Sequence, residues 1–170
     1  MEHPHAPVAA EAGAGAGAGT EVAGDAYIIR PLDLVDHSKG FCELLAQLSP
    51  SPPLSEEAFR ARFAELAALG ADHLVLVAEE AATGRLAAAG ALMVERKFIR
   101  RCGLVGHLED VVVDAAARGR GLGERLVRRL VEHARGRGCY KVILNCTTEL
   151  KGFYAKCGFE EKNVQMGLYF

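Results

Sequence analysis

Several features that would assign the chain to a specialised class of protein are missing from its 170 residues. The formal net charge is only −2, so the charge balance does not point to nucleic acid or to an anionic membrane. The longest apolar run, Leu86–Val94, is far shorter than the roughly 20 residues that span a bilayer. Internal repeats are also absent, and the length and apolar content fit one globular domain.

The cysteines lack the spacing of a zinc site or of a disulfide framework. Their number is odd and no two form a C-x-x-C pair. They are Cys42, Cys102, Cys139, Cys146 and Cys157. We therefore expect free thiols in a reducing compartment, which favours the cytoplasm, and no metal site.

The first 25 residues lack the features of a targeting peptide. They contain no arginine, they carry four acidic residues, and their centre is the low-complexity run GAGAGAGAG. A secretory signal needs a basic start and an apolar core, and neither is present. This composition buries too little apolar surface to offset the entropy of ordering. We expect Met1–Asp25 to be a disordered tail and residues 26–170 to form the domain.

Apolar periodicity predicts strands and helices after this tail. We expect a helix capped by Asp36 that runs to about Leu48, and a second helix capped by Ser55 and ended by Gly70. A third helix should begin near Leu122, and a short fourth one should end at Gly158. Strands are expected at residues 27–31, 74–78, 86–95, 108–113, 140–146 and 159–170.

The strand that ends at Val113 contains two adjacent carboxylates, Glu109 and Asp110. Neighbouring strand residues point to opposite faces, so one carboxylate should face the core side and the other a cleft. A buried carboxylate is costly unless it is paired. In the preceding strand, Gly90 predicts a bulge or a close approach of the backbone.

A glycine-rich loop, Arg118–Gly123, follows that strand and opens the third helix. Backbone N–H groups at a helix N-terminus suit a phosphate or pyrophosphate, and arginines add charge for it. A P-loop would need Lys-Ser or Lys-Thr after Gly123, and a dinucleotide fingerprint would need a small residue at Glu124. Neither fits, which leaves a plain turn or another anion-binding loop. The helix and the next strand complete a β-α-β unit with parallel strands.

The loop matches [QR]-x-x-G-x-[GA] and resembles the acyl-coenzyme A signature of the GCN5-related N-acetyltransferases. There, loop amides hold the pyrophosphate. Residues 153–159, FYAKCGF, resemble a second element of these enzymes. The segments ERKFI, GHLEDVVV and GCYKVIL narrow the resemblance to the glucosamine 6-phosphate N-acetyltransferase family. The resemblance covers residues 27–170 and implies an α+β sandwich with a mixed central sheet flanked by helices.

The resemblance implies acetyl transfer from acetyl-CoA to the 2-amino group of D-glucosamine 6-phosphate, a step toward UDP-N-acetylglucosamine. Glu109, Asp110 or a backbone carbonyl would take the amine proton, and Tyr154 would stand near the departing thiolate. The positions that match the cofactor site of the family are Val111, Val112, Val113, Arg118, Gly119, Arg120, Gly121, Leu122, Gly123, Asn145, Thr147 and Tyr154.

The resemblance also implies a sugar-phosphate site. Its matching positions are Ser49, Lys97, Phe98, Ile99, Arg100, Glu109, Asp110, Val111, Tyr140, Lys141 and Tyr169. Two of them depart from the family pattern: Arg100 stands where a histidine is usual, and Tyr169 stands where a basic residue reaches the phosphate. Taken alone, the basic segment around Lys97 is more typical of a solvated loop than of a binding site.

Members of the family are two-fold homodimers whose C-terminal strands cross, and the apolar end Leu168–Phe170 is compatible with that. The alternative is a terminal strand packed within its own chain. Peripheral association with the cytosolic face of endomembranes stays open. Two other functions also stay open. Acetylation of a protein or peptide amine would suit an acidic groove, whereas here the substrate side is basic. A non-catalytic acetyl-CoA sensor would not need Glu109, Asp110 and Tyr154.

Overall fold

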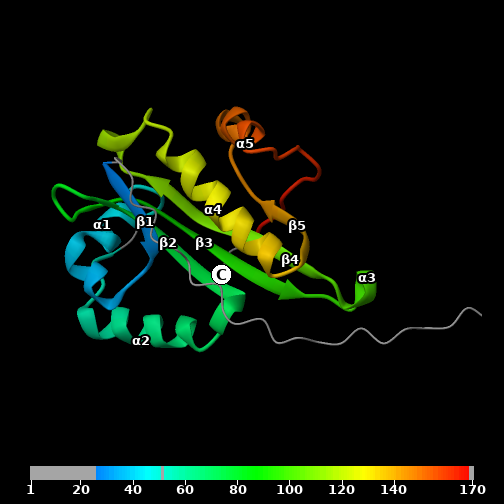
Figure 1. Ribbon diagram of the computed structural model, residues 1–170, viewed down its shortest axis with the longest axis horizontal. Coiled ribbons are helices and arrows are strands. Elements are labelled where there is room, and N and C mark those ends of the chain that lie inside the picture. Colours follow the sequence, from blue (N-terminus) through cyan, green and yellow to red (C-terminus); the bar gives the residue numbers. More distant parts are fainter. Residues whose placement is uncertain (1–25, 51, 169–170) are drawn as a thin grey trace, which may run out of the picture.

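A five-stranded sheet forms the centre of the computed structural model, which describes residues 26–50 and 52–168 (Figure 1). Its strands lie in chain order: β1 (Tyr27–Pro31), β2 (His73–Glu80), β3 (Leu86–Arg96), β4 (Leu104–Val113) and β5 (Cys139–Leu144). Neighbours from β1 to β4 are antiparallel, and β5 runs parallel to β4. The predicted mixed sheet and its β-α-β unit are confirmed.

The helices flank this sheet. They are α1 (Phe41–Leu45), α2 (Glu56–Ala67), α3 (Ile99–Cys102), α4 (Leu122–Gly136) and α5 (Lys151–Lys156). Short 3-10 helices are η1 (Leu34–Lys39), η2 (Gly70–Asp72), η3 (Ala115–Ala117) and η4 (Thr148–Leu150). Within the described ranges, none of the helices combines the length and apolar character needed to cross a membrane.

The core lies in two layers, one on each face of the sheet. α4 crosses the front of the sheet in Figure 1, and its predicted apolar face is confirmed, because Leu126, Val127 and Leu130 are completely buried. On the other face, α1 and α2 place Phe41 and Phe59 against buried residues of β2, β3 and β4. Each buried leucine or phenylalanine contributes about 2 kcal/mol. Both layers meet at β4, so this strand is held from both sides.

Gly90 lies in the middle of β3 because α4 leaves no room for a side chain there. A Cβ atom at this position would lie 3.1 Å from Cδ1 of Leu130 and 3.3 Å from Cδ2 of Leu126. The register between β3 and β4 also shifts at this point, between Ala89 and Ala91. The sequence predicted a bulge or a close approach, and both are present.

The predicted helix from Asp36 to Leu48 is wrong, because the chain forms two short helices there. Asp33 caps η1, and its carboxylate accepts a hydrogen bond from the N–H of Val35. Gly40, at φ 88°, then turns the chain and separates η1 from α1. The sequence pattern misassigned the cap because Asp33 and Asp36 both precede an apolar run.

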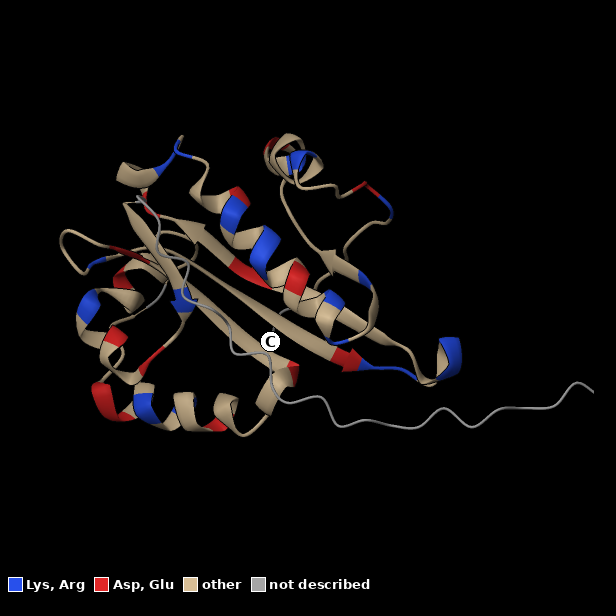
Figure 2. Ribbon diagram, in the orientation of Figure 1, with Lys and Arg blue, Asp and Glu red and all other residues tan. Residues whose placement is uncertain are grey.

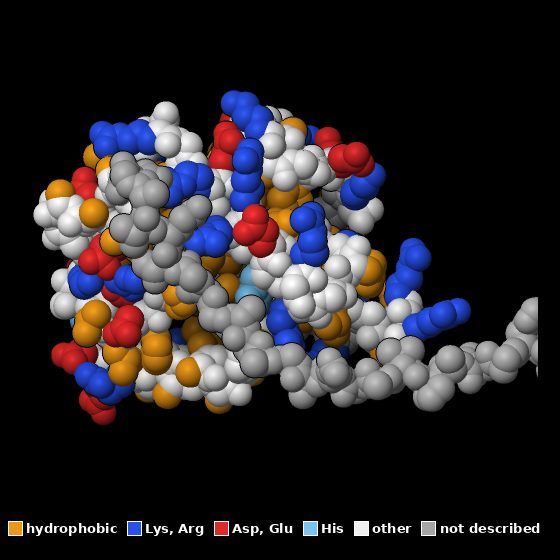
Figure 3. All heavy atoms as spheres, viewed as in Figure 1, with side chains coloured by type: hydrophobic (Ala, Val, Ile, Leu, Met, Phe, Trp, Pro, Cys, Tyr) orange, Lys and Arg blue, Asp and Glu red, His pale blue; other side chains and the backbone are white. Residues whose placement is uncertain are grey.

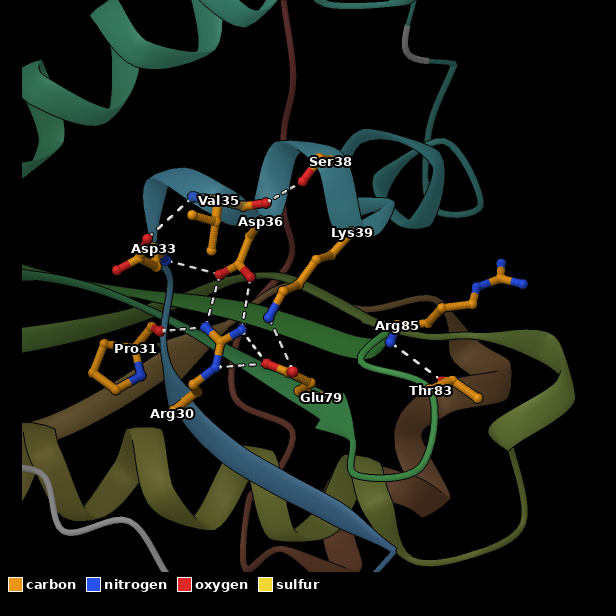
Figure 4. A network of polar contacts seen from close by, with 10 residues as sticks. All are labelled: Arg30, Pro31, Asp33, Val35, Asp36, Ser38, Lys39, Glu79, Thr83 and Arg85. Atoms are coloured by element: carbon orange, nitrogen blue, oxygen red, sulfur yellow. Dashed lines mark hydrogen bonds and ion pairs between the residues drawn. The ribbon is translucent and has the colours of Figure 1, made fainter.

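Asp36 is a fully buried ion-pair partner. Its carboxylate accepts hydrogen bonds from Nη1 and Nη2 of Arg30 at 2.8 and 2.7 Å (Figure 4). Arg30 also contacts Glu79, which accepts a hydrogen bond from Lys39 at 2.9 Å. Burial alone would raise the pKa of Asp36, but the bonds from Arg30 and from the N–H of Asp33 outweigh it and lower the pKa. This network fastens η1 to β1 and β2.

Two predictions for the C-terminal part are wrong. The strand expected at residues 140–146 ends at Leu144 and is an edge strand, with Tyr140 and Ile143 exposed. Residues 159–168 form no strand, and their apolar side chains Val164 and Met166 are 89% and 93% exposed. An alternating pattern becomes a strand only beside a hydrogen-bonding neighbour. The described part of this segment therefore does not pack within its own chain as a terminal strand.

Two further predictions fall on residues that the structure does not describe. They are the tail Met1–Asp25 and the substrate contact at Tyr169.

Candidate active site

β4 and β5 separate where the site begins. Their last paired residues are Leu108 and Leu144, whereas β4 continues to Val113. No residue of β5 therefore pairs with the edge of β4 between Glu109 and Val113. Apart from the Val113 carbonyl, which accepts from Arg118, backbone groups at this edge are available to a ligand. A pocket of about 640 Å³ lies at this edge. An extended ligand chain can bond to such an edge as a neighbouring strand would.

A bulge in β4 changes the direction of the two carboxylates. Asp110 has φ 52°, in the left-handed region, and the β3–β4 register shifts here. Leu108 and Val111 consequently pack on the same core layer, although they are three residues apart. Both Glu109 and Asp110 are exposed. The prediction that one of them faces the core side is wrong, because the alternation on which it rested is broken by the bulge.

The glycine loop before α4 presents its backbone to the same pocket. Gly119 and Gly121 have φ 77° and 71°, and a Cβ atom on either would meet no atom within 4 Å. Gly121 is the N-cap of the 15-residue helix α4, and no side chain caps that helix. The uncapped N–H groups and the positive end of the helix dipole therefore face open space, as binding of an anionic group requires.

Most of the loop residues predicted to bind the cofactor line this pocket. Together with the strand end, the predicted residues found there are Val111, Val112, Val113, Arg118, Gly119, Gly121, Leu122, Gly123 and Tyr154. The Arg118 guanidinium donates from Nε to the carbonyl of Val113 at 3.1 Å. Arg120 does not line the pocket, and its Nη1 donates to the hydroxyl of Tyr27 at 3.0 Å. Val112 is buried in the opposite core layer, so only its backbone can reach a ligand.

Tyr154 is held rigidly at the base of the site. Its ring is 8% exposed and makes edge-on contacts with Phe153 and Phe159, at centroid distances of 4.9 and 6.0 Å. Burial raises the pKa of Tyr154, and Cys146, Cys157 and Glu109 raise it further. The hydroxyl is therefore protonated at neutral pH and can donate a proton or a hydrogen bond.

Asn145 and Thr147 do not line this pocket. Asn145 lies beside a second hollow of about 1030 Å³, between β5 and the segment after α5, and Tyr154 borders both. Thr147 lines neither. Both residues follow β5 directly, on the side where β4 and β5 have separated.

The predicted sugar-phosphate residues fall into two groups. Arg100, Tyr140 and Lys141 form a basic cluster, in which the guanidinium Cζ and the ammonium Nζ lie 5.7 and 5.8 Å from the tyrosine ring centroid. This cluster lies at the α3 end of the sheet, where basic residues gather (Figure 2). Because Lys141 pairs with Val105, the cluster lies about 13 Å along β4 from Glu109. The second group, which includes Glu109 and Asp110, therefore lies apart from the basic cluster within one chain.

The rest of the predicted phosphate segment lies beside this cluster. Lys97 is paired with Glu95, whose other oxygen lies 2.8 Å from Nε2 of His107. The bonds from Lys97 and then from His107 lower the pKa of Glu95. Phe98 and Ile99 are 97% and 65% exposed, at the tip between β3 and β4. Figure 3 shows basic side chains projecting into solvent from this end of the molecule.

A strand edge, an uncapped glycine loop and a buried tyrosine thus converge on one pocket. Residues 40–159 match the model of the acetyltransferase (GNAT) family. The chain belongs to this family.

Individual GNAT relatives cover nearly the whole chain. Glucosamine 6-phosphate N-acetyltransferase 1 of Oryza sativa subsp. japonica is 79% identical over 170 residues, which is all of both chains. The crystal structure of glucosamine-6-phosphate N-acetyltransferase from Arabidopsis thaliana is 47% identical, with a TM-score of 0.85 over 86% of this chain and 99% of that one. A Trypanosoma brucei acetyltransferase structure is 40% identical, with a TM-score of 0.78 over 85% and 99%.

The GNAT pocket contains residues that the sequence did not single out. Gln47 and Leu48 line it from the segment after α1, and Leu150, Phe153 and Lys156 line it from η4 and α5. Leu48 precedes Ser49, which is exposed and does not itself line the pocket. Phe153 belongs to the FYAKCGF motif and could have been found from it. Gln47 carried no local signal, because its partners lie 67 and 68 residues away in the sequence.

Proposed function

We propose that this chain is a glucosamine 6-phosphate N-acetyltransferase, which moves acetyl from acetyl-CoA to the 2-amino group of D-glucosamine 6-phosphate. The observation that supports this proposal most strongly is the sequence identity of 79% over the full length with the rice protein of that name. The geometry supports it, because the free strand edge, the glycine loop and the buried phenol of Tyr154 line one pocket. The exposed carboxylates Glu109 and Asp110 do not line this pocket, but they directly precede its wall residue Val111.

The pyrophosphate, the pantetheine arm and the sulfur of acetyl-CoA match successive parts of this pocket. The N–H groups of Gly119, Gly121 and the first turn of α4 face the pyrophosphate, and the Arg118 side chain adds positive charge beside it. The unpaired edge of β4 at Val111–Val113 offers backbone partners to the pantetheine arm and thioester. Tyr154, at the base, stands where the sulfur would end. This placement supports the predicted cofactor residues with the exceptions noted for Arg120, Asn145 and Thr147.

The reaction is a direct attack of the sugar amine on the thioester carbonyl. The ammonium must first lose a proton, and Glu109 or Asp110 is placed in water at the strand bulge to accept it. The amine nitrogen then bonds to the carbonyl carbon, and a backbone N–H of β4 donates to the oxyanion. When the C–S bond breaks, the Tyr154 hydroxyl donates its proton to the thiolate, and the second proton lost by the sugar nitrogen restores the hydroxyl through solvent. No cysteine intermediate is needed.

We propose further that the enzyme acts as a two-fold homodimer. Two observations support this: the basic cluster is separated from Glu109 within one chain, and the apolar side chains of Val164, Met166 and Leu168 are exposed. A second subunit would cover these side chains and could supply basic residues to the sugar phosphate. Sedimentation velocity tests the proposal. The wild type should sediment as a dimer and Met166→Asp as a monomer, whereas a monomeric wild type would contradict it.

The substrate is tested by thiol release from acetyl-CoA with matched acceptors. Glucosamine 6-phosphate should support fast release, and unphosphorylated glucosamine should raise KM by a factor of about 100, since a charge-assisted phosphate contact is lost. Equal use of both sugars would refute phosphate recognition. Release only with a lysine peptide would refute the sugar assignment, and tight acetyl-CoA binding without release to any acceptor would indicate a sensor.

A further inference from the structure

Gln47 connects two segments of the pocket wall. Its Nε2 donates to Oδ2 of Asp114 at 3.0 Å, and its Oε1 accepts from the backbone N–H of Ala115 at 3.0 Å. Asp114 uses its other oxygen, Oδ1, to cap η3 through the N–H of Ala116 at 2.8 Å. The Gln47 amide thus uses both its NH2 group and its oxygen in hydrogen bonds, and the Asp114 carboxylate uses both of its oxygens. Each donor faces an acceptor.

The two segments are firmly held on either side of this contact. The backbone N–H of Asp114 donates to the carbonyl of Ala87 in β3 at 2.8 Å. On the other side, Leu44 of α1 is 1% exposed in the core layer that contains Phe41 and Phe59, and the N–H of Gln47 donates to the Leu44 carbonyl at 3.1 Å. The Gln47 side chain therefore holds the end of α1 against Asp114 and Ala115, which lead into the cofactor loop.

The segment that Gln47 fastens forms one wall of the pocket and leads to the sugar contact expected at Ser49. Leu48 lines the pocket, and Ser49, the next residue, matches a sugar-contact position. The loop Arg118–Gly123 and the edge of β4 form the coenzyme side, and they are held additionally by the pairing of β4 with β3 and by α4. Loss of the Gln47 contact would therefore disturb acceptor binding more than coenzyme binding.

We propose that Gln47 is a positioning residue for the acceptor: its amide, held by Asp114 and Ala115, keeps the segment Leu48–Ser49 beside the acetyl group. This inference rests on the proposed function in two respects, the identity of the acceptor and the sugar contact expected at Ser49.

The test is a reciprocal exchange of the two side chains. Gln47→Glu places two acceptor oxygens against each other, and Asp114→Asn places two N–H donors against each other. In the double variant Q47E/D114N, the amide now at position 114 donates to the carboxylate now at position 47. That carboxylate still accepts from the N–H of Ala115, and the amide oxygen keeps the η3 cap. Ala46→Glu is the charge control, because Ala46 is an exposed neighbour that makes no contact with Asp114.

Each single variant should raise the KM for glucosamine 6-phosphate about tenfold, and the double variant should return it to within about twofold of the wild type. The Kd for coenzyme A should change less than about twofold in all of them. Hydrogen exchange of a peptide covering residues 46–49 should speed up in the single variants and recover in the double variant. Ala46→Glu should match the wild type.

A double variant no better than the single ones would overturn the proposal, and so would equal losses of coenzyme and acceptor affinity. The acceptor assignment is checked separately by the wild type. If the wild type uses another amine, the proposed function fails, and the same exchange measured with that amine still decides the role of Gln47.

Discussion

Leu108 and Val111 lie on the same face of β4, although strand alternation would place residues three apart on opposite faces. The extra residue is Asp110, whose left-handed φ of 52° turns the chain and shifts the register against β3. This single irregularity frees the edge of β4 and moves both carboxylates into water. The bulge lies directly beside the pocket residue Val111.

The bulge should make position 110 selective for residues that tolerate the left-handed region. Asp110→Val should lower the free energy of unfolding by about 1–2 kcal/mol, because a β-branched side chain clashes with its own carbonyl there. Asp110→Asn, the matched control, should cost less than about 0.5 kcal/mol, because asparagine adopts this conformation readily. Urea denaturation measures both. Equal stability of the two variants would show that the bulge is not retained in solution.

Tyr154→Phe should lower kcat about a hundredfold while the Kd for coenzyme A stays within about twofold, because only the proton donor to the thiolate is lost. The pKa of Tyr154 is raised above its ordinary value near 10. A raised phenol pKa keeps the hydroxyl protonated, so its contribution to the rate should persist through pH 9. The ratio of wild-type to variant kcat between pH 7 and 9 tests this. A ratio that falls toward one over this range would contradict the role.

Asp36→Asn should destabilise the protein by about 3 kcal/mol, because it leaves part of the buried charge of Arg30 uncompensated. The folded pKa of Asp36 is lowered, so its contribution is complete above the unfolded value near 3.9 and is lost as the pH falls through the lower folded value. Urea unfolding should show a larger difference between this variant and the wild type at pH 7 than at pH 3.

The exposed pair of Arg60 and Glu56 provides a control for this ion pair. Arg60→Gln should cost less than about 0.5 kcal/mol, because an exposed helical pair gains little in water. An Asp36→Asn variant as stable as Arg60→Gln would show that the network in Figure 4 does not hold η1 in place.

Arg100→Gln should raise the KM for glucosamine 6-phosphate about tenfold and leave the KM for glucosamine unchanged, if its guanidinium serves the phosphate. Arg101→Gln removes the same charge from the same turn and should change either constant less than about twofold. Initial rates with both sugars separate the two variants. Equal effects of the two substitutions would mean that the segment contributes only general positive charge.

Local patterns were sufficient for much of the fold. The apolar face of α4, the Ser55 cap of α2 and the glycines that surround α4 each depend on neighbours a few residues away, and the structure confirms them. Asp36 shows where such reasoning fails. Its partner Arg30 and the second partner of Arg30, Glu79, come from different strands, so the same residue type that caps helices elsewhere is here a buried ion-pair partner.

The sequence by itself determined the strands β1 to β4, the helices α2 and α4, and the glycine loop before α4, because each depends on short-range spacing and on residue type. Only the tertiary structure decided the direction of Glu109 and Asp110, the contact of Gln47 with Asp114 and the exposure of β5. These depend on register and on segments that meet after folding. A shift of one residue reverses every face of a strand, and no local pattern records that shift.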